Sequence, residues 1–246
     1  MNQKNVKKFV SLTAVLLSMA LLISTAAFVA ATPPTAHYRV TIKNMSSGQP
    51  ISPPVAVTHS RDLHLFQRGK LASDAIEAIA EDGNQAPAVA LLTGMAGVTD
   101  VVDVGMPLTP AGTAVGSFSD TITFDITAAP GDRFSLAGML ICTNDGIVGL
   151  DSVKLPAHNR KQYRAHAYDA GTEANTELSG DIVDPCSALG PVALAGDPNG
   201  NEDAAVNTDP AEAIRYHRGI VGTGDLTDAH DWRGPIARVT ITRINN

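Results

Sequence analysis

One stretch decides the fold of this chain: Phe118-Ser119-Asp120-Thr121-Ile122-Thr123-Phe124-Asp125-Ile126-Thr127. One face carries Phe118, Ile122, Phe124 and Ile126, and the other carries Ser119, Thr121, Thr123, Asp125 and Thr127. Alternation with a period of two is typical of a half-buried β-strand. Pro130-Gly131-Asp132 then predicts a turn, and residues 133–142 are apolar on both faces, as expected of a central strand. The two segments together predict a β-hairpin.

Similar patterns on both sides of this hairpin predict a sheet protein. Further strands are expected at 37–43, 55–59, 98–104, 147–155, 162–168 and 236–244. Ser73 can cap a helix over 73–81 that Asp82-Gly83 can stop, and 86–93 predicts a second short helix. The expected fold class is therefore all-β: an antiparallel β-sandwich of about eight strands with a short helical insertion, forming a single domain over 32–246.

The first 31 residues have the pattern of a signal peptide. Lys4, Lys7 and Lys8 form a basic start, and residues 9–31 are almost wholly apolar. Val29-Ala30-Ala31 offers the small residues that a signal peptidase reads, so the mature chain is expected to start at Thr32. An uncleaved membrane anchor is the alternative, because 23 apolar residues can span a bilayer. A lipoprotein anchor is disfavoured, because that route needs a cysteine at the cleavage site and the chain has cysteines only at 142 and 186.

The net charge limits the classes of ligand that the exported chain is expected to bind. Removal of the leader removes three lysines and no acid, which leaves 15 basic and 25 acidic residues and a formal charge of −10. An acidic exported domain is a poor candidate for binding nucleic acid or an anionic membrane, and a reasonable one for binding divalent cations. Membrane contact is expected only if the leader is uncleaved. The expected location is secreted, periplasmic or at the cell surface.

The two cysteines predict one disulfide. Cys142 ends an apolar strand, and Cys186 lies in an Asp-Pro-Cys loop. An exported protein with two cysteines is expected to pair them, and the bridge would close a loop that contains two acidic turns. Two free, buried thiols are the alternative.

Two acidic turns follow predicted strands and indicate a metal site. Asp145 and Asp151 flank the start of one strand, and Asp169 and Glu173 follow the next. Because neighbouring loops converge at one end of a sandwich, these four carboxylates are the candidate ligands for calcium, which prefers oxygen. The alternative for Asp145 is a tight Asn-Asp-Gly turn without an ion. Zinc is disfavoured because no cysteine or paired histidine accompanies the cluster; His230 with Asp231 is a weak candidate.

The sequence carries no assembled catalytic set. It has no Gly-x-Ser-x-Gly elbow, phosphate-binding glycine loop or dinucleotide fingerprint. With one tryptophan and four tyrosines it also has few of the aromatic residues that line sugar clefts. We therefore expect a protein that is not an enzyme. The alternative is a metal-assisted hydrolase that uses the acidic turns and His230.

Four separated segments resemble the spondin N-terminal domain family. They are His37 to Asn44, Phe134 to Asp151, Tyr168 to Thr172 and Pro235 to Arg243. The resemblance implies a β-sandwich like that of calcium-dependent phospholipid-binding domains, with calcium held by the loops at one end. It also implies an adhesion or interaction module, with an unidentified protein or glycan ligand at the cell surface. Gly146 departs from the pattern, because animal relatives usually have a tryptophan there, and residues 182–232 look longer and more acidic.

Overall fold

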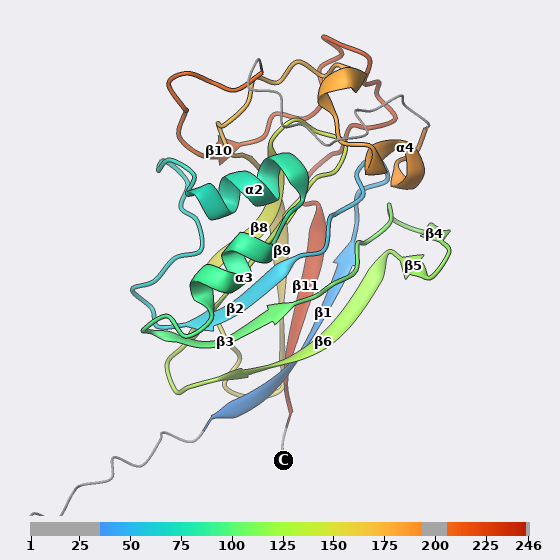
Figure 1. Cartoon of the computed structure of the whole chain (residues 1–246). Coiled ribbons are helices and arrows are strands. Elements are labelled where there is room, and N and C mark those ends of the chain that lie inside the picture. The colour runs from blue at the N-terminus through green and yellow to red at the C-terminus, as the bar shows by residue number, and fades with distance from the viewer. Residues whose placement is uncertain (1–34, 193–205, 245–246) are drawn as a thin grey trace, which may run out of the picture. The chain divides into compact units, whose positions relative to one another are not determined.

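A computed structural model describes residues 35–192 and 206–244 of the chain. The leader predicted at 1–31 and the start of the mature chain at Thr32 lie outside these residues. The described residues form an all-β fold with a short helical insertion, as predicted (Figure 1).

The strands match the predicted segments closely. The long strands are β1 (Ala36–Asn44), β2 (Val55–His59), β3 (Val98–Asp103), β6 (Thr121–Ala128), β7 (Arg133–Met139), β8 (Gly146–Lys154), β9 (Arg160–Asp169) and β11 (Ala237–Ile244). Two-residue strands are β4 (Ala114–Val115), β5 (Phe118–Ser119) and β10 (Arg215–Tyr216). The helices are α2 (Asp74–Asp82), α3 (Ala86–Leu92), α4 (Pro185–Leu189) and the 3-10 turn η1 (Ser179–Asp181).

The strands form two layers joined through β9. The order is β3-β2-β7-β8-β9-β11-β1-β6, and every pairing is antiparallel. Residues 160–165 of β9 pair with β11, whereas residues 166–169 pair with β8, so one strand belongs to both layers. At the other edge the sheet nearly closes, because Asp100 of β3 accepts the backbone N–H (2.8 Å) and the hydroxyl (2.9 Å) of Thr127 on β6.

The core has two parts that lie on opposite faces of the β2–β7 layer. Ala56 and Leu136 face the other layer, where Val40 and Val239 also lie. Successive strand residues point to opposite faces. Val55, Val57 and Ala137 therefore face outward and are covered by Ile76 and Ile79 of α2. This double burial explains why 133–142 is apolar on both faces.

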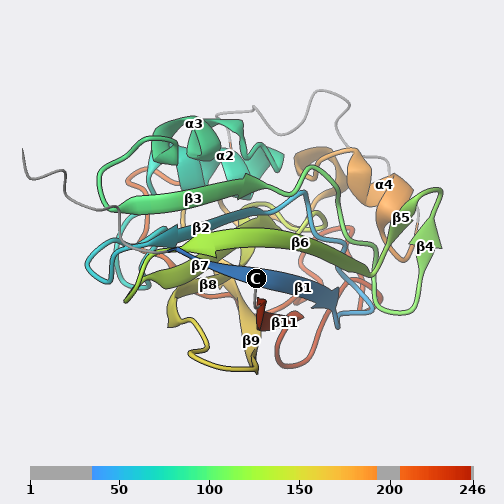
Figure 2. The same cartoon turned by 90° about the horizontal axis from the view of Figure 1, so that it is seen from below.

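The helical insertion covers only this layer. Ser73 caps α2 by accepting the backbone N–H of Ile76 (3.4 Å), and Gly83 ends it in the left-handed conformation (φ 64°). Both ends were predicted. Figure 2 shows α2 and α3 on one side of the layers and β9 and β11 on the other, so none of the helices in residues 35–192 and 206–244 covers the outer face of β9, β11 and β1.

The structure differs from the prediction in its shortest elements, since β4, β10 and η1 were not predicted. The strand predicted at 118–127 is interrupted at Asp120, where β5 ends and β6 begins. Helix α4 was not predicted, because five residues give no usable periodicity. Among the residues that the structure describes, none of the helices is long and apolar enough to cross a bilayer.

Candidate metal site

The pairing of β8 with β9 brings two predicted ligands together. Gly146 at the start of β8 pairs with Asp169 at the end of β9. Asp145 therefore lies beside Asp169, and the Asp145 carbonyl accepts the backbone N–H of Ala170 (3.1 Å). This end of the molecule, where both strands pass into loops, is called the acidic pole below.

Asp145 is the most buried acid of the pole and has an unused oxygen. Its side chain is 0% exposed. One carboxylate oxygen accepts the backbone N–H groups of Thr172 (2.9 Å) and Glu173 (3.2 Å). The other oxygen, Oδ1, is buried with no hydrogen-bond partner. Burial and then the charge of Asp169 raise the pKa of Asp145 to about 6.

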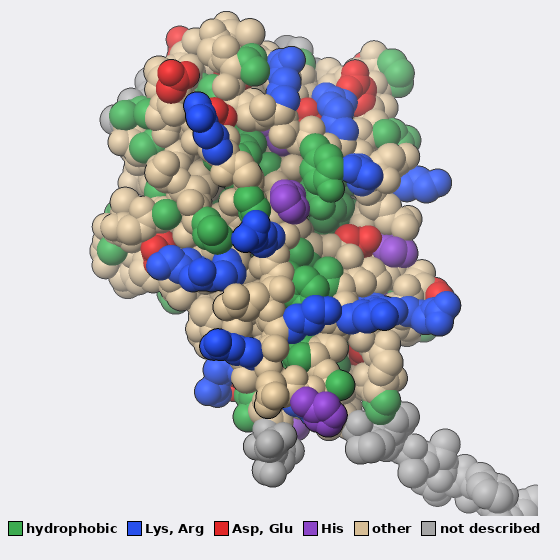
Figure 3. All heavy atoms as spheres, turned by 180° about the vertical axis from the view of Figure 1, so that it is seen from behind, with side chains coloured by type: hydrophobic (Ala, Val, Ile, Leu, Met, Phe, Trp, Pro, Cys, Tyr) green, Lys and Arg blue, Asp and Glu red, His purple; other side chains and the backbone are tan. Residues whose placement is uncertain are grey.

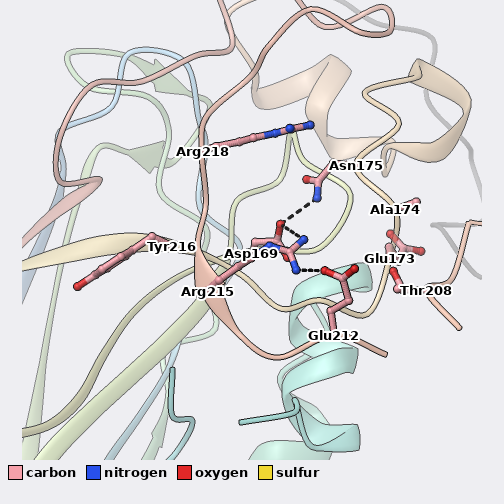
Figure 4. A pocket seen from close by; sticks show the side chains of 9 residues that line it. All are labelled: Asp169, Glu173, Ala174, Asn175, Thr208, Glu212, Arg215, Tyr216 and Arg218. Atoms are coloured by element: carbon pink, nitrogen blue, oxygen red, sulfur yellow. Dashed lines mark hydrogen bonds and ion pairs between the residues drawn. The ribbon is translucent and has the colours of Figure 1, made fainter. Parts of the chain in front are cut away.

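Asp169 is engaged on both oxygens. Its Oδ1 accepts the backbone N–H of Gly171 (3.0 Å), and its Oδ2 accepts the side chains of Asn175 (2.9 Å) and Arg215 (2.9 Å). Figure 4 shows this carboxylate between Asn175 and Arg215, with Glu212 on the far side of the guanidinium. Asp169 therefore fixes the loop after β9, and a cation there would share it with Arg215.

Two further acids complete the pole, and the sequence predicted only one of them. Glu173 is 1% exposed, and Glu81, in the last turn of α2, is 9% exposed with a buried Oε1 that has no partner. Burial, followed by neighbouring acids, raises the pKa of Glu173 to about 9 and that of Glu81 to about 7. One signal for Glu81 was available: α2 has acidic residues and no basic one in its last turn, where the helix dipole favours cations.

Asp151 does not lie at the pole. It is six residues along β8 from Asp145, or roughly 20 Å in an extended strand. Its Oδ2 forms a hydrogen bond of 2.6 Å with His64 Nδ1. The structure thus brings together Asp145, Asp169 and Glu173 of the predicted set and separates Asp151 from them.

The cysteines form the predicted disulfide. Cys142 and Cys186 are bonded, 44 residues apart in sequence. In the chain-entropy model a loop of this size stabilises the fold by about 4 kcal/mol. The loop that the bond closes contains Asp145, Asp169 and Glu173, so the disulfide ties down the segment that builds the pole.

His230 lies against the disulfide rather than in an open site. Its ring is 0% exposed, and its Nδ1 accepts the backbone N–H of Thr227 (3.1 Å). Within the described residues, His230 and the two cysteines are the one group whose metal-binding atoms all lie within 4.8 Å of one another. Because both sulfurs are committed to the disulfide, this group is not a zinc site. The carboxylates of the pole are spaced more widely than that group.

A pocket of about 450 Å³ opens beside the pole. Its lining includes Asp169, Glu173 and Asn175 together with Arg215 and Arg218, and Figure 4 shows Arg215 directly beside Asp169. Solvent and small ions therefore have access to the edge of an otherwise buried acidic cluster.

A comparison against protein families identifies the family of this chain. A family model described as Spondin_N matches residues 43–182, more than half of the chain. The chain belongs to the spondin N-terminal domain family. The matched part of this spondin domain runs from the end of β1 to Ile182 and includes Glu81, Asp145, Asp169 and Glu173. A comparison with curated proteins found no match.

Family membership fits an extracellular interaction module. Spondin domains are in general non-enzymatic modules, and the disulfide is consistent with an extracellular location. Gly146 has no room for a side chain. A Cβ on Gly146 would lie 2.3 Å from Thr143 Oγ1, and that oxygen already accepts the Gly146 N–H at 2.9 Å.

Proposed function

We propose that this spondin domain is an exported, non-enzymatic interaction module whose acidic pole binds calcium. Asp145, Glu173 and Glu81 are the proposed ligands, with Asp169 contributing through the oxygen that it shares with Arg215. The proposed partner is a protein or glycan at the cell surface, contacted by the loops around the pole.

The buried, unpartnered Oδ1 of Asp145 carries the proposal. More than nine in ten buried polar groups have a hydrogen-bond partner, and an unsatisfied charged one is costly. A hard cation provides the missing partner, because calcium takes six to eight oxygen ligands. Glu81 Oε1 is a second buried oxygen of the pole that has no hydrogen-bond partner.

The charge balance of the pole supports the same conclusion. Four acids are buried there, and Arg215 forms an ion pair with one of them, Asp169. The raised pKa values of Glu173 (about 9) and Glu81 (about 7) mean that protons neutralise part of the cluster at neutral pH when no cation is bound, whereas Asp145, with a pKa of about 6, is ionised. Calcium would replace those protons and draw the widely spaced side chains inward by rotation.

The pole is connected to exposed apolar loops that suit a partner. Asn144, next to Asp145, accepts the backbone N–H of Glu177 at 3.2 Å. The Glu177 carboxylate in turn accepts the N–H groups of Val221 and Thr223, each at 2.7 Å. Leu178 and Val221 are 45% and 49% exposed on these loops. An ion at Asp145 would therefore stabilise the loop conformation that presents them.

The test is thermal melting during a calcium titration. Extracellular calcium modules have Kd values of about 10⁻⁴–10⁻³ M, so 10 mM calcium corresponds to about 10–100 times Kd and stabilises by about 1.4–2.7 kcal/mol. For a domain of this size the melting temperature should rise by about 3–11 °C. Magnesium, which demands a tighter octahedral site, should give a smaller rise.

Asp145→Asn should abolish the rise. Asp151→Asn is the matched control, because it makes the same chemical change on β8 at a carboxylate that contacts His64 instead of the pole. The proposal is refuted if calcium does not shift the melting of the unmodified domain. It is also refuted if Asp145→Asn keeps the shift while Asp151→Asn loses it.

A further inference from the structure

The outer face of β9, β11 and β1 carries rows of cations set by strand register. Arg164 of β9 pairs with Arg238 of β11, and Arg238 pairs with Lys43 of β1. All three side chains point outward, because successive strand residues face opposite sides of a sheet and the adjacent residues are buried in the core. These buried neighbours are Ala165 on β9, Ala237 and Val239 on β11, and Ile42 on β1. Three positive side chains therefore stand side by side across adjacent strands, about 4.8 Å apart from strand to strand.

Three like charges side by side on neighbouring strands are an unfavourable arrangement. Like charges directly opposite each other on neighbouring strands destabilise a sheet. Lys43 has a counter-ion in Asp120 at 3.6 Å, but Arg164 and Arg238 form no ion pair with any other residue in 35–192 or 206–244. Within the described residues, no acid relieves the repulsion between Arg164 and Arg238.

A second cationic row lies four residues away along the strands. Arg39 of β1 and Arg160 of β9 flank Thr242 of β11 in this row. Arg39 is paired with the exposed Asp125 at 2.8 Å, whereas Arg160 forms no ion pair with another described residue. The two rows are about 13 Å apart, as four strand residues span that distance.

The strip between the rows is polar and hydrogen-bonding. Thr123, Thr41, Thr240 and Gln162 lie across it in register. Gln162 donates to Thr240 at 3.3 Å, and the hydroxyls of Thr41 and Thr123 are 2.9 Å apart. The face thus combines guanidinium groups with hydroxyls and an amide on a broad, uncovered sheet surface. Figure 3 shows this side of the molecule, where Lys and Arg are spread over the surface with few acids among them.

The residue types on this face indicate which class of polyanion it suits: a membrane, a nucleic acid or a polysaccharide. None of the exposed large hydrophobic residues in the described chain lies on β1, β6, β9 or β11, so the face lacks the apolar groups that insert into a membrane. Among the described residues it also has no helix that could enter a nucleic-acid groove. The exposed Tyr216 stacks on Tyr168, four residues along β9 from Arg164, so this aromatic pair lies outside the two cationic rows. Arginine pairs bidentately with planar or tetrahedral oxyanions, and hydroxyl and amide groups bond sugar hydroxyls.

We propose that the outer face of β9, β11 and β1 is a docking surface for a linear polysaccharide that carries sulfate or carboxylate groups. Arg164, Arg238 and Lys43 hold the first run of anions, and Arg160 holds the next. The domain as a whole is acidic, with a formal charge of −7 for the full chain. Binding is decided by the local field of this face and not by the net charge. The surface is separate from the acidic pole and does not depend on calcium.

The experiment measures binding of fluorescent dextran sulfate by anisotropy in EDTA, over a range of salt concentrations. Uncharged dextran, phosphatidylserine vesicles and a DNA duplex of similar charge are the comparison ligands. The unmodified domain should bind dextran sulfate with a salt-dependent affinity, and not dextran. Arg164→Glu/Arg238→Glu should weaken binding by about tenfold to thirtyfold at 150 mM salt and lower the salt slope by about 2.

The control variant is Arg61→Glu/Lys70→Glu, which makes the same charge change at two exposed residues before α2. It should bind dextran sulfate within about twofold of the unmodified domain, because only the general charge has changed. The proposal is overturned if both variants lose affinity equally, if the face variant binds normally, or if vesicles or DNA bind more tightly than dextran sulfate. Melting curves establish that each variant is folded.

Discussion

Asp145→Asn should stabilise the calcium-free domain at alkaline pH even though it removes the proposed calcium site. In the native protein the carboxylate is fully buried, and one oxygen has no partner. The asparagine carbonyl can accept the same N–H groups of Thr172 and Glu173. Its amide can then take the place of Oδ1, where it points at other acids as a hydrogen-bond donor instead of a charge.

The magnitude follows from the pKa of Asp145. Burial raises this pKa from 3.8 to about 6. A shift of about 2.2 units corresponds to about 3 kcal/mol, since one unit is worth 1.36 kcal/mol. The folded state binds the proton more tightly than the unfolded state, so the penalty is absent below about pH 3.8 and is complete above about pH 6. The variant should therefore gain about 1–3 kcal/mol at pH 8 and almost nothing at pH 4.

The assay is urea unfolding in EDTA at pH 4, 6 and 8, followed by the same measurement at pH 8 in 10 mM calcium. Without calcium the variant should be more stable than the unmodified domain at pH 8. With calcium, this difference in the free energy of unfolding should become smaller or change sign. Asp151→Asn should show neither effect, since its partner His64 is partly exposed and such pairs are worth under about 1 kcal/mol. A variant that is less stable than the unmodified domain at pH 8 in EDTA would refute the reasoning, as would a gain of equal size at pH 4.

Three further predictions concern the pole and the core. Because the pKa of Glu173 is about 9, calcium binding should release protons and strengthen between pH 7 and 9; calorimetry in buffers of different ionisation enthalpy measures this release, and equal heats in all buffers would contradict it. Replacing Cys142 and Cys186 by serine should lower the free energy of unfolding by about 4 kcal/mol, as measured by urea unfolding, and a loss under 1 kcal/mol would show that the disulfide constrains little. Gly149→Ala should destabilise by about 1–3 kcal/mol, because the new Cβ would lie 2.6 Å from the Phe66 ring, whereas Gly180→Ala meets nothing within 4 Å and should change stability by less than about 1 kcal/mol.

The sequence by itself determined most of the elements. The alternation in 118–127 and the double apolar pattern in 133–142 predicted β6 and β7, and Ser73 and Gly83 predicted both ends of α2. These signals are local, since side-chain direction in a strand and the unsatisfied groups at a helix end depend on residues a few positions apart. The disulfide was also predictable, because a chain with two cysteines allows only one intramolecular pairing.

Only the tertiary structure decided which side chains share a site. The pairing of Gly146 with Asp169 placed Asp145 beside Asp169 and left Asp151 far along β8, a distinction that depends on register and extension. Glu81 lies at the acidic pole although it belongs to α2, some 60 residues before Asp145 in sequence. No local sequence pattern specifies that contact. The basic row of Arg164, Arg238 and Lys43 likewise exists because β9, β11 and β1 are neighbours in the sheet. Strand order and register are set by the packing of the whole core, and so the charges that they bring together appear only once the chain has folded.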